Sequence, residues 1–427
     1  MFKSQKNKMR LDKEQFKFLR DLCHRSKDLF NATLYETRQH FFRCGQFLNY
    51  NTAYHVMKEQ EVFKRLPTDP GTQTMKVVER CFRSFFGLLK KKQGGNYNRP
   101  VSIPHYLDKD GHFILLFPIR EGRCKNEFVV RVPKDMQEEY SFKQFTYTVP
   151  PNVKGHKIKE VRILPKAGAT YFEIEFVYEV EQEDKRLDKK HILSIDLGVD
   201  NFATCLDSKS GLSFILDGKV MKSINRFYNK TKGYLQGVLD HQDKKWSKRL
   251  GRFSGKRSRM LGEHLSQYAN LVVEVCLSNN IGKVVVGEGW LAQNGVNLGK
   301  RNNQNFVNLP FGKFVWKLQA KCWFYGIEVV THEESYTSKC DHLAGEPMKH
   351  HEKYMGKRRP RGLFHSSTGI IINADTNGAL GILLKESKQK GLLTQLCSGG
   401  VTPPRRIRLR EIQQTSSKKL ALNIFNI

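Results

Sequence analysis

Hydrophobic residues in the first third of the chain recur at helical spacing. Asp12 precedes the first such run and Gln15 follows three residues later, which is the pattern of a reciprocal helix cap. A second amphipathic run extends from about Thr74 to Lys92. These patterns predict a mostly helical first third. The apolar positions of the two runs are Phe16, Leu19, Cys23, Phe30 and Leu34, then Val78, Cys81, Phe82, Phe85 and Leu89.

The period then changes to two, which is typical of strands. In Tyr171–Val180, apolar residues alternate with glutamates, so this strand is expected to be half buried. Lys166–Ala169 predicts the hairpin turn before it, and the charged run Glu181–Lys190 predicts a boundary. The expected strands are Phe113–Ile119, Phe128–Val132, Val161–Leu164 and Tyr171–Val180.

The second half alternates short apolar strands with amphipathic helices, which predicts an α/β domain with a mixed sheet. The helices are a long stretch ending near Cys276, then Phe311–Cys322 and Ala374–Lys385. From Gly399 the chain is polar and rich in arginine, so we expect a mobile tail. The expected strands are His191–Ile195, Phe202–Leu206, Leu212–Leu216, Val284–Val286 and Ile327–Val330.

Charge narrows the function. The 427 residues suffice for two or three domains, and 73 Lys and Arg against 42 Asp and Glu give a net charge of +31. Such a charge favours a polyanionic partner, and nucleic acid fits better than a membrane surface because no helix pairs a basic face with a clean apolar one. The chain has no apolar run long enough to span a membrane. Its basic first ten residues are not followed by an apolar core, so we expect that they are not a secretory signal.

The nine cysteines are scattered singly and never form a C-x-x-C pair. This spacing argues against a disulfide framework and for a reducing compartment. We therefore expect a cytoplasmic protein.

Three acids lie at positions, two strand ends and one helix start, where α/β folds often place catalytic carboxylates. Asp196 ends an apolar strand, with Gly198 allowing a tight turn beside it, and Glu288 ends another strand between two glycines. Asp375 lies in the first turn of the last predicted helix. Each alone has an ordinary explanation, as a loop acid, a cap or an acid favoured by the helix dipole. Their order and positions together predict one site.

Carboxylates are the ligands expected for magnesium-dependent phosphodiester hydrolysis. Two divalent ions about 3.5–4 Å apart can activate the water and stabilise the leaving oxygen. Because Mg²⁺ prefers oxygen ligands, acids suit this chemistry better than histidines. We therefore expect Asp196, Glu288 and Asp375 to be both the catalytic and the metal-binding residues of a nuclease with an RNase H-like core.

These residues resemble the split RuvC nuclease of TnpB proteins, the transposon-encoded RNA-guided DNA endonucleases that are similar to compact type V CRISPR effectors. The resemblance covers nearly the whole chain. Its RuvC motifs are Ile195–Val199, Val286–Glu288 and Asn373–Ala379. Further similar segments are Asn303–Phe306, Pro310–Phe311, Glu334–Lys339, Lys357–Leu363, Phe85–Lys90 and Arg99–Tyr106.

The resemblance implies a multidomain α/β and β fold: a RuvC nuclease domain and a β-barrel wedge domain with a helical recognition insertion. It also implies a guide RNA and a double-stranded target DNA with a short flanking motif, in a bacterial or archaeal cytoplasm. The implied divisions are the first part of the wedge barrel (1–10), the recognition domain (11–104), the rest of the barrel (105–188), RuvC with a long helical segment (189–331), a target-nucleic-acid-binding insertion (332–365), the third RuvC motif (366–390) and the mobile tail (391–427).

One feature of many relatives is missing. They carry a four-cysteine zinc ribbon between the second and third motifs, whereas His332–His365 holds only Cys340 among several histidines. Structural zinc sites need closely paired ligands, and the adjacent His350 and His351 do not easily supply two to one ion. We expect no zinc and an insertion that folds by packing alone.

Basic residues are the candidates for nucleic-acid contact. Between Lys244 and Arg259 the chain has eight basic residues and no acid, with Trp246 and Phe253 among the basic residues. It is either a flexible charged loop or a strip that follows a phosphate backbone, and its place between two motifs favours the strip. The full set is Lys76, Arg80 and Arg83; Lys244, Lys245, Lys248, Arg249, Arg252, Lys256, Arg257 and Arg259; and Lys357, Arg358 and Arg361.

Several functions remain open at this point. The first is an RNA-guided, Mg²⁺-dependent DNA endonuclease. The second is an RNA-guided DNA-binding protein or repressor that does not cut, against which the complete acid trio counts. The third is a compact type V CRISPR effector, and the last is a strand-transfer transposase, against which the RuvC-type motifs and the helical first part count.

Overall fold

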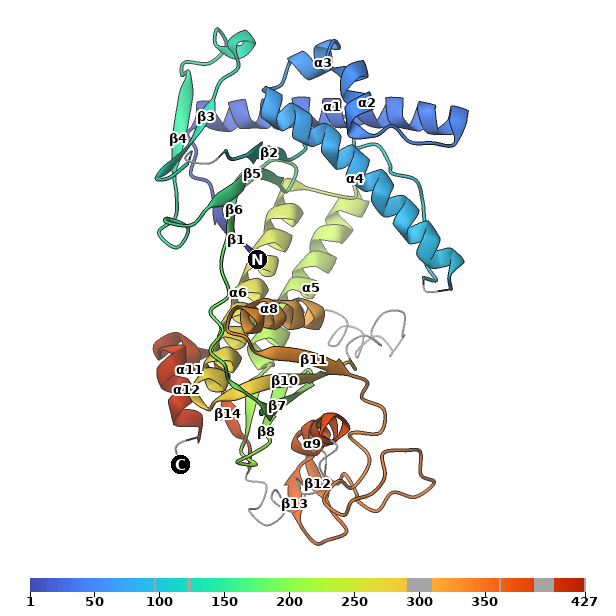
Figure 1. Ribbon diagram of the computed structural model, residues 1–427, viewed down its shortest axis with the longest axis vertical. Coiled ribbons are helices and arrows are strands. Elements are labelled where there is room, and N and C mark those ends of the chain that lie inside the picture. The colour runs from blue at the N-terminus through green and yellow to red at the C-terminus, as the bar shows by residue number, and fades with distance from the viewer. Residues whose placement is uncertain (96, 121–123, 290–308, 361, 388–402, 426–427) are drawn as a thin grey trace. The chain divides into compact units, whose positions relative to one another are not determined.

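A computed structural model describes residues 1–95, 97–120, 124–289, 309–360, 362–387 and 403–425. The chain divides into two units, Met1–Val180 and Glu181–Ile427 (Figure 1). The division falls at the start of the charged run Glu181–Lys190.

The helices of the first unit pack on one another through aromatic residues. The first begins where the sequence predicts: Asp12 Oδ1 accepts from the Gln15 backbone N–H at 2.8 Å, and the Gln15 side chain accepts from the Asp12 N–H. Phe30 and Leu34 pack against Val78 and Phe82 in a buried cluster. The helices are α1 (Lys13–Cys44), α2 (Tyr50–Met57), α3 (Glu61–Lys64) and α4 (Thr68–Gln93).

The strands of this unit form an open antiparallel sheet of order β1-β6-β5-β2 and a separate hairpin, β3-β4. Because β3 and β4 pair only with each other, the described strands do not close the expected barrel. Glu175, on the alternating strand, is buried and pairs with Lys6 and Arg162. The strands are β1 (Phe2–Lys8), β2 (Leu115–Pro118), β3 (Glu127–Arg131), β4 (Gln144–Thr148), β5 (Ile158–Lys166) and β6 (Tyr171–Glu179), with a 3₁₀ turn at Lys134–Met136.

The second unit is built on a mixed six-stranded sheet of order β11-β10-β7-β8-β9-β14. Strands β7, β8 and β9 are antiparallel neighbours, β10 and β11 run parallel to β7, and β14 runs parallel to β9. This confirms the predicted α/β class with a mixed sheet. The strands are β7 (Asp188–Leu197), β8 (Asn201–Asp207), β9 (Ser213–Asp217), β10 (Ile281–Gly287), β11 (Glu328–His332) and β14 (Arg405–Ile407).

Helices cover both faces of this sheet (Figure 1). On one face, residues such as Ile195 and Val286 join a large core with α6 and α8; on the other, Ile192 and Val285 pack with α9. Side chains of successive strand residues alternate between faces, so Asp196 belongs to the face that α9 covers. The helices are α5 (Lys219–Asp240), α6 (Lys248–Ser278), α8 (Phe311–Phe324) and α9 (Ala374–Glu386). None of the described helices is long and apolar enough to cross a membrane.

The expectation of a mobile tail over 391–427 is wrong for residues 403–425. This segment forms β14, α11 (Leu409–Gln414) and α12 (Ser417–Phe425), and buries Ile407, Leu420 and Ile424 in the large core. The arginines dominate the composition, but the apolar residues between them recur at spacings that bury one face against α6.

The insertion after β11 is held by two acids. Buried Asp341 accepts from the Ser366 hydroxyl at 2.8 Å and the Ser367 N–H at 2.7 Å, and Glu346 accepts from the N–H groups of Asp341 and Met355. The short strands β12 (Leu363–His365) and β13 (Ile371–Asn373) close the segment. It therefore folds on a hydrogen-bond network as well as on apolar packing.

Candidate active site

Two of the predicted acids lie at the ends of neighbouring parallel strands. Ile195 of β7 lies opposite Val286 of β10, so Asp196, the next residue of β7, and Glu288, which follows β10, lie at the same edge of the sheet. The carboxyl ends of parallel strands form the usual site edge of an open sheet. The Glu288 N–H donates to the His332 carbonyl oxygen at 2.7 Å and its carboxylate accepts from the Thr331 hydroxyl, so β11 fixes its position.

Asp375 reaches the same edge from the covering helix. Asn373 caps α9, accepting from the N–H groups of Asp375 and Thr376 at 3.0 and 3.2 Å. One turn later, Gly378 packs so tightly that a Cβ there would lie 2.5 Å from Asp196 Oδ2. A residue without a side chain at this position lets the helix start approach Asp196.

The Asp375 carboxylate is bound on both oxygens. Arg358 donates to its Oδ1 at 2.8 Å from the insertion, and Asn201 Nδ2 donates to its Oδ2 at 2.6 Å from the start of β8. Arg358 was expected on a nucleic-acid surface, whereas here its guanidinium lies against a candidate catalytic acid.

A fourth carboxylate, Glu334, lies at this edge and was given no role from the sequence. It follows β11, and its oxygens fill the space beside Gly287 and Gly289, where any Cβ would clash with them. Its Oε1 is buried without a hydrogen-bond partner among the described residues. The available signal was that Glu334 follows an apolar strand, as Asp196 and Glu288 do.

The electrostatics show that the acids are close. Burial raises the pKa of Asp196 well above its ordinary range, the carboxylates of Glu334 and Asp375 raise it further, and Arg358 lowers it. Burial also raises the pKa of Glu334, which a backbone N–H from Gly289 partly offsets. Opposed carboxylates of this kind favour either a shared proton or a bound cation.

The donor set has the chemistry for a hard cation, since every candidate ligand is a carboxylate oxygen. As the side chains stand, no three Asp, Glu, His or Cys groups in the described ranges are close enough to hold one ion. Glu288 is bonded to Thr331, and Asp375 to Asn201 and Arg358. The buried Glu334 oxygen and the raised pKa of Asp196 nevertheless mark negative charge that a divalent ion would neutralise.

The basic run between the motifs is largely helical, not a loop. Lys244 and Lys245 lie in the turn after α5, and the other six residues lie on α6. Lys248, Arg252 and Lys256 share one exposed face at four-residue intervals. Arg249 and Arg259 are also exposed.

Arg257 and Phe253 have structural partners. Arg257 Nε donates to Asn225 Oδ1 at 2.8 Å, and its guanidinium lies 4.7 Å from the Tyr228 ring. Phe253 stacks on Tyr228, whereas Trp246 is exposed. These contacts join α5 to α6, so Trp246 is the exposed one of the two interleaved aromatics.

The remaining basic candidates differ in their surroundings. On α4, Lys76 lies over the Tyr50 ring and Arg83 pairs with Glu79, whereas Arg80 is exposed. Lys357 is exposed on the insertion. Arg361 and the TnpB-like segment Asn303–Phe306 lie outside the described residues.

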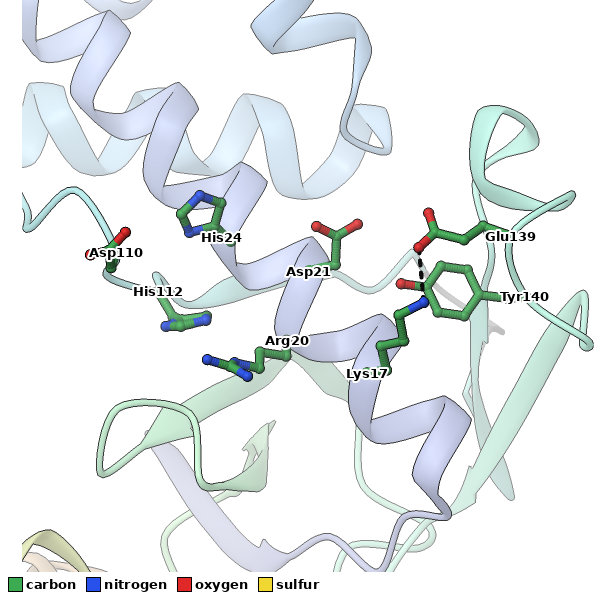
Figure 2. A pocket seen from close by; sticks show the side chains of 8 residues that line it. All are labelled: Lys17, Arg20, Asp21, His24, Asp110, His112, Glu139 and Tyr140. Atoms are coloured by element: carbon green, nitrogen blue, oxygen red, sulfur yellow. Dashed lines mark hydrogen bonds and ion pairs between the residues drawn. The ribbon is translucent and has the colours of Figure 1, made fainter. Parts of the chain in front are cut away.

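A pocket of about 320 Å³ in the first unit contains none of these candidates (Figure 2). Lys17 pairs with Glu139 at 3.1 Å. Burial, together with the charges of Arg20, His24 and Lys27, lowers the pKa of His112 to about 4. Its lining mixes acids and cations, so it lacks the excess positive charge of a phosphate site. The lining residues are Lys17, Arg20, Asp21, His24, Asp110, His112, Glu139 and Tyr140.

Two protein-family models match consecutive segments that lie largely in the second unit. A family model described as a probable transposase, OrfB_IS605, matches residues 175–290, and one described as a Cas12f1-like TNB domain matches residues 311–382. A TnpB-like protein, ORF457, of Acidianus two-tailed virus is 24% identical over 406 residues, covering 86% of this chain and 83% of the viral protein.

The fold also resembles a solved structure. The Cas12f1 chain in a cryo-EM structure of a Cas12f1–sgRNA–target DNA complex matches with a TM-score of 0.58 and 15% identity, over 87% of this chain and 83% of that one. The match and the two-unit organisation define a multidomain α/β protein with a Cas12-like fold. The two family models, the viral relative and the similar fold together support a TnpB-family protein related to the type V effectors. This confirms the resemblance drawn from the sequence motifs.

Proposed function

We propose that this chain is an RNA-guided DNA endonuclease that hydrolyses target DNA in a RuvC-type, magnesium-dependent reaction. One observation carries the proposal: Asp196 and Glu288 end adjacent parallel strands, and Asp375 approaches Asp196 from the helix that covers them. The antiparallel strands β7, β8 and β9, with the parallel strands β10 and β11 beside β7, also support an RNase H-like sheet.

The proposed partners are a guide RNA and target DNA. The structurally similar Cas12f1 was solved with an sgRNA and target DNA, and the charge of +31 suits such polyanions. In this arrangement base pairing reads the target, while the protein holds the duplex backbones and reads a short flanking motif. The exposed cations of α6 are the proposed backbone contacts.

Each residue at the sheet edge has a proposed task. Asp196, Glu288 and Asp375 would hold magnesium, with Glu334 as a further oxygen donor; bound magnesium supplies an activated water and stabilises the leaving oxygen. Arg358 lowers the pKa of Asp196 and binds the Asp375 carboxylate, so its positive charge offsets part of the repulsion between these acids. Thr331 holds the Glu288 carboxylate at the end of β10.

The test is cleavage of supercoiled DNA by the chain purified with its RNA, whose sequence identifies the guide. Asp196→Ala should lower the cleavage rate by at least about a thousandfold, because a ligand of the reacting centre is lost. RNA-dependent DNA binding should persist. Asp200→Ala is the matched control, since Asp200 is exposed in the same turn and pairs with Lys222. Substantial cleavage by Asp196→Ala would refute the assignment.

A second candidate is RNA-guided DNA binding without cleavage. It is favoured by the side-chain arrangement, in which the Arg358 guanidinium already pairs with the Asp375 carboxylate. The same assay separates the two functions: wild-type protein that binds guided DNA but leaves it intact in Mg²⁺ would support the second.

A further inference from the structure

The second oxygen of Asp375 is tied to the C-terminal strand through one intervening side chain. Asn201 Nδ2 donates to Asp375 Oδ2 at 2.6 Å, and Asn201 Oδ1 accepts from Arg406 Nη2 at 2.6 Å. Arg406 Nη1 in turn donates to Asp217 Oδ1 at 2.9 Å. A continuous set of hydrogen bonds therefore runs from β14 to a candidate catalytic acid.

The sheet brings these residues together across 205 positions of sequence. Asn201 pairs with Asp217 at the end of the β8–β9 ladder, and Arg406 lies beside Ile215 in the parallel β9–β14 pair. Asp217 is almost fully buried, whereas Arg406 is about one-third exposed. An ion pair that is half shielded from water holds the guanidinium at a fixed place beside Asn201.

Arg406 decides which way the Asn201 amide points. An amide has an oxygen that only accepts and a nitrogen that only donates, and its two orientations have almost the same shape. A guanidinium only donates, so it requires the Asn201 oxygen to face it and the NH₂ group to face Asp375. Without Arg406, the opposite orientation would place the amide oxygen against the Asp375 carboxylate.

We propose that Arg406 and Asn201 are positioning residues that fix the Asp375 carboxylate for metal binding, so that the C-terminal strand is part of the nuclease centre. This inference rests on the proposed function, in which Asp375 is a metal ligand. Arg406 acts only through Asn201. Groups that orient a metal ligand from behind typically change metal affinity by about tenfold to a hundredfold.

The test compares Arg406→Ala and Asn201→Asp with Arg405→Ala in the full-length chain. Arg405 precedes Arg406 on the same strand, is exposed, and bonds the Asn423 carbonyl oxygen instead, so it controls for damage to β14. Asn201→Asp keeps the shape and the acceptor for Arg406 but replaces the donor to Asp375 with a like charge. Two readouts are needed: Mn²⁺ affinity by calorimetry, and the Mg²⁺ concentration for half-maximal DNA cleavage.

We expect both variants to weaken Mn²⁺ binding and raise the half-maximal Mg²⁺ concentration by about tenfold or more, with cleavage partly recovered at high Mg²⁺. The Mn²⁺ affinity and the half-maximal Mg²⁺ concentration of Arg406→Lys should lie between those of the wild type and Arg406→Ala, because one ammonium replaces a guanidinium that donates through two nitrogens. Arg405→Ala should match the wild type.

Unchanged metal affinity in Arg406→Ala and Asn201→Asp would overturn the inference while leaving the proposed function intact. A wild type that binds Mn²⁺ without cutting DNA would instead refute the proposed function, and weaker Mn²⁺ binding in the two variants would still support the positioning role. Wild-type protein that binds no Mn²⁺ would overturn both.

Discussion

At the scale of single residues, Asp196 shows how a site works against the stability of its fold. Its raised pKa means that the folded chain holds a proton there which the unfolded chain releases at lower pH. The stability from that proton is lost as pH rises from the unfolded value of about 3.9 through the raised folded value. At neutral pH the metal-free protein is therefore less stable with Asp196 than with a neutral side chain of the same shape, and a bound cation would offset this cost.

Asp196→Asn should accordingly raise the melting temperature of the metal-free protein at pH 7, by about 2–4 °C for each kcal/mol of relieved repulsion. Thermal unfolding in EDTA measures this shift, and Mg²⁺ should narrow the difference by stabilising only the wild type. Asp243→Asn is the control, because Asp243 is exposed in the turn after α5 and should melt like the wild type. A variant less stable than the wild type in EDTA would contradict the interpretation.

At the scale of elements, α6 separates two kinds of basic residue that look alike in sequence. Arg252 and Lys256 are on its exposed face, whereas Arg257 joins α6 to Asn225 and Tyr228 of α5. The eight-residue run is therefore neither a loop nor a uniform phosphate-binding strip. Helical geometry assigns one part of it to solvent and another to packing.

The double variant Arg252→Ala, Lys256→Ala should weaken nucleic-acid binding at unchanged melting temperature. Arg257→Ala should lower the free energy of unfolding by about 1–2 kcal/mol, through the lost hydrogen bond and cation–π contact. Fluorescence anisotropy with labelled RNA and thermal unfolding measure the two effects. The opposite pattern, with Arg257→Ala affecting only binding, would refute this division.

At the scale of the whole molecule, the charge of +31 is distributed over both units, since α4 and α6 each carry exposed cations. Binding through many phosphate contacts releases counterions, which makes affinity steeply dependent on salt. The C-terminal segment adds a second property of the whole chain: its last described helices complete the core of the second unit.

Affinity for RNA should fall by about 10³–10⁵ between 50 and 200 mM salt if 6–10 phosphates are contacted. A plot of log Kd against log salt concentration measures this number. The double variant Arg252→Ala, Lys256→Ala should reduce the magnitude of this slope by up to about two, because it removes up to two phosphate contacts. A flat response would show that the charge does not drive binding.

The sequence by itself determined the features that depend on local pattern. The Asp12–Gln15 cap, the strands that lead into Asp196 and Glu288, and the helix with Asp375 in its first turn all follow from spacing over a few residues. Neither β4 nor β14 was predicted: the alternation of Phe145 and Tyr147 in β4 extends over only five residues, and β14 is three residues long and lies among arginines. Periodicity reports which face of an element is buried, but not which element covers it.

Only the tertiary structure decided the partners. Glu334 enters the site because β11 pairs with β10, Arg358 because the insertion folds back to Asp375, and Arg406 because β14 extends the sheet beside β9. These contacts join residues far apart in sequence, and their formation depends on strand order and helix placement, which no local pattern encodes. The sequence therefore indicated which acids to expect, whereas the fold determined what holds them.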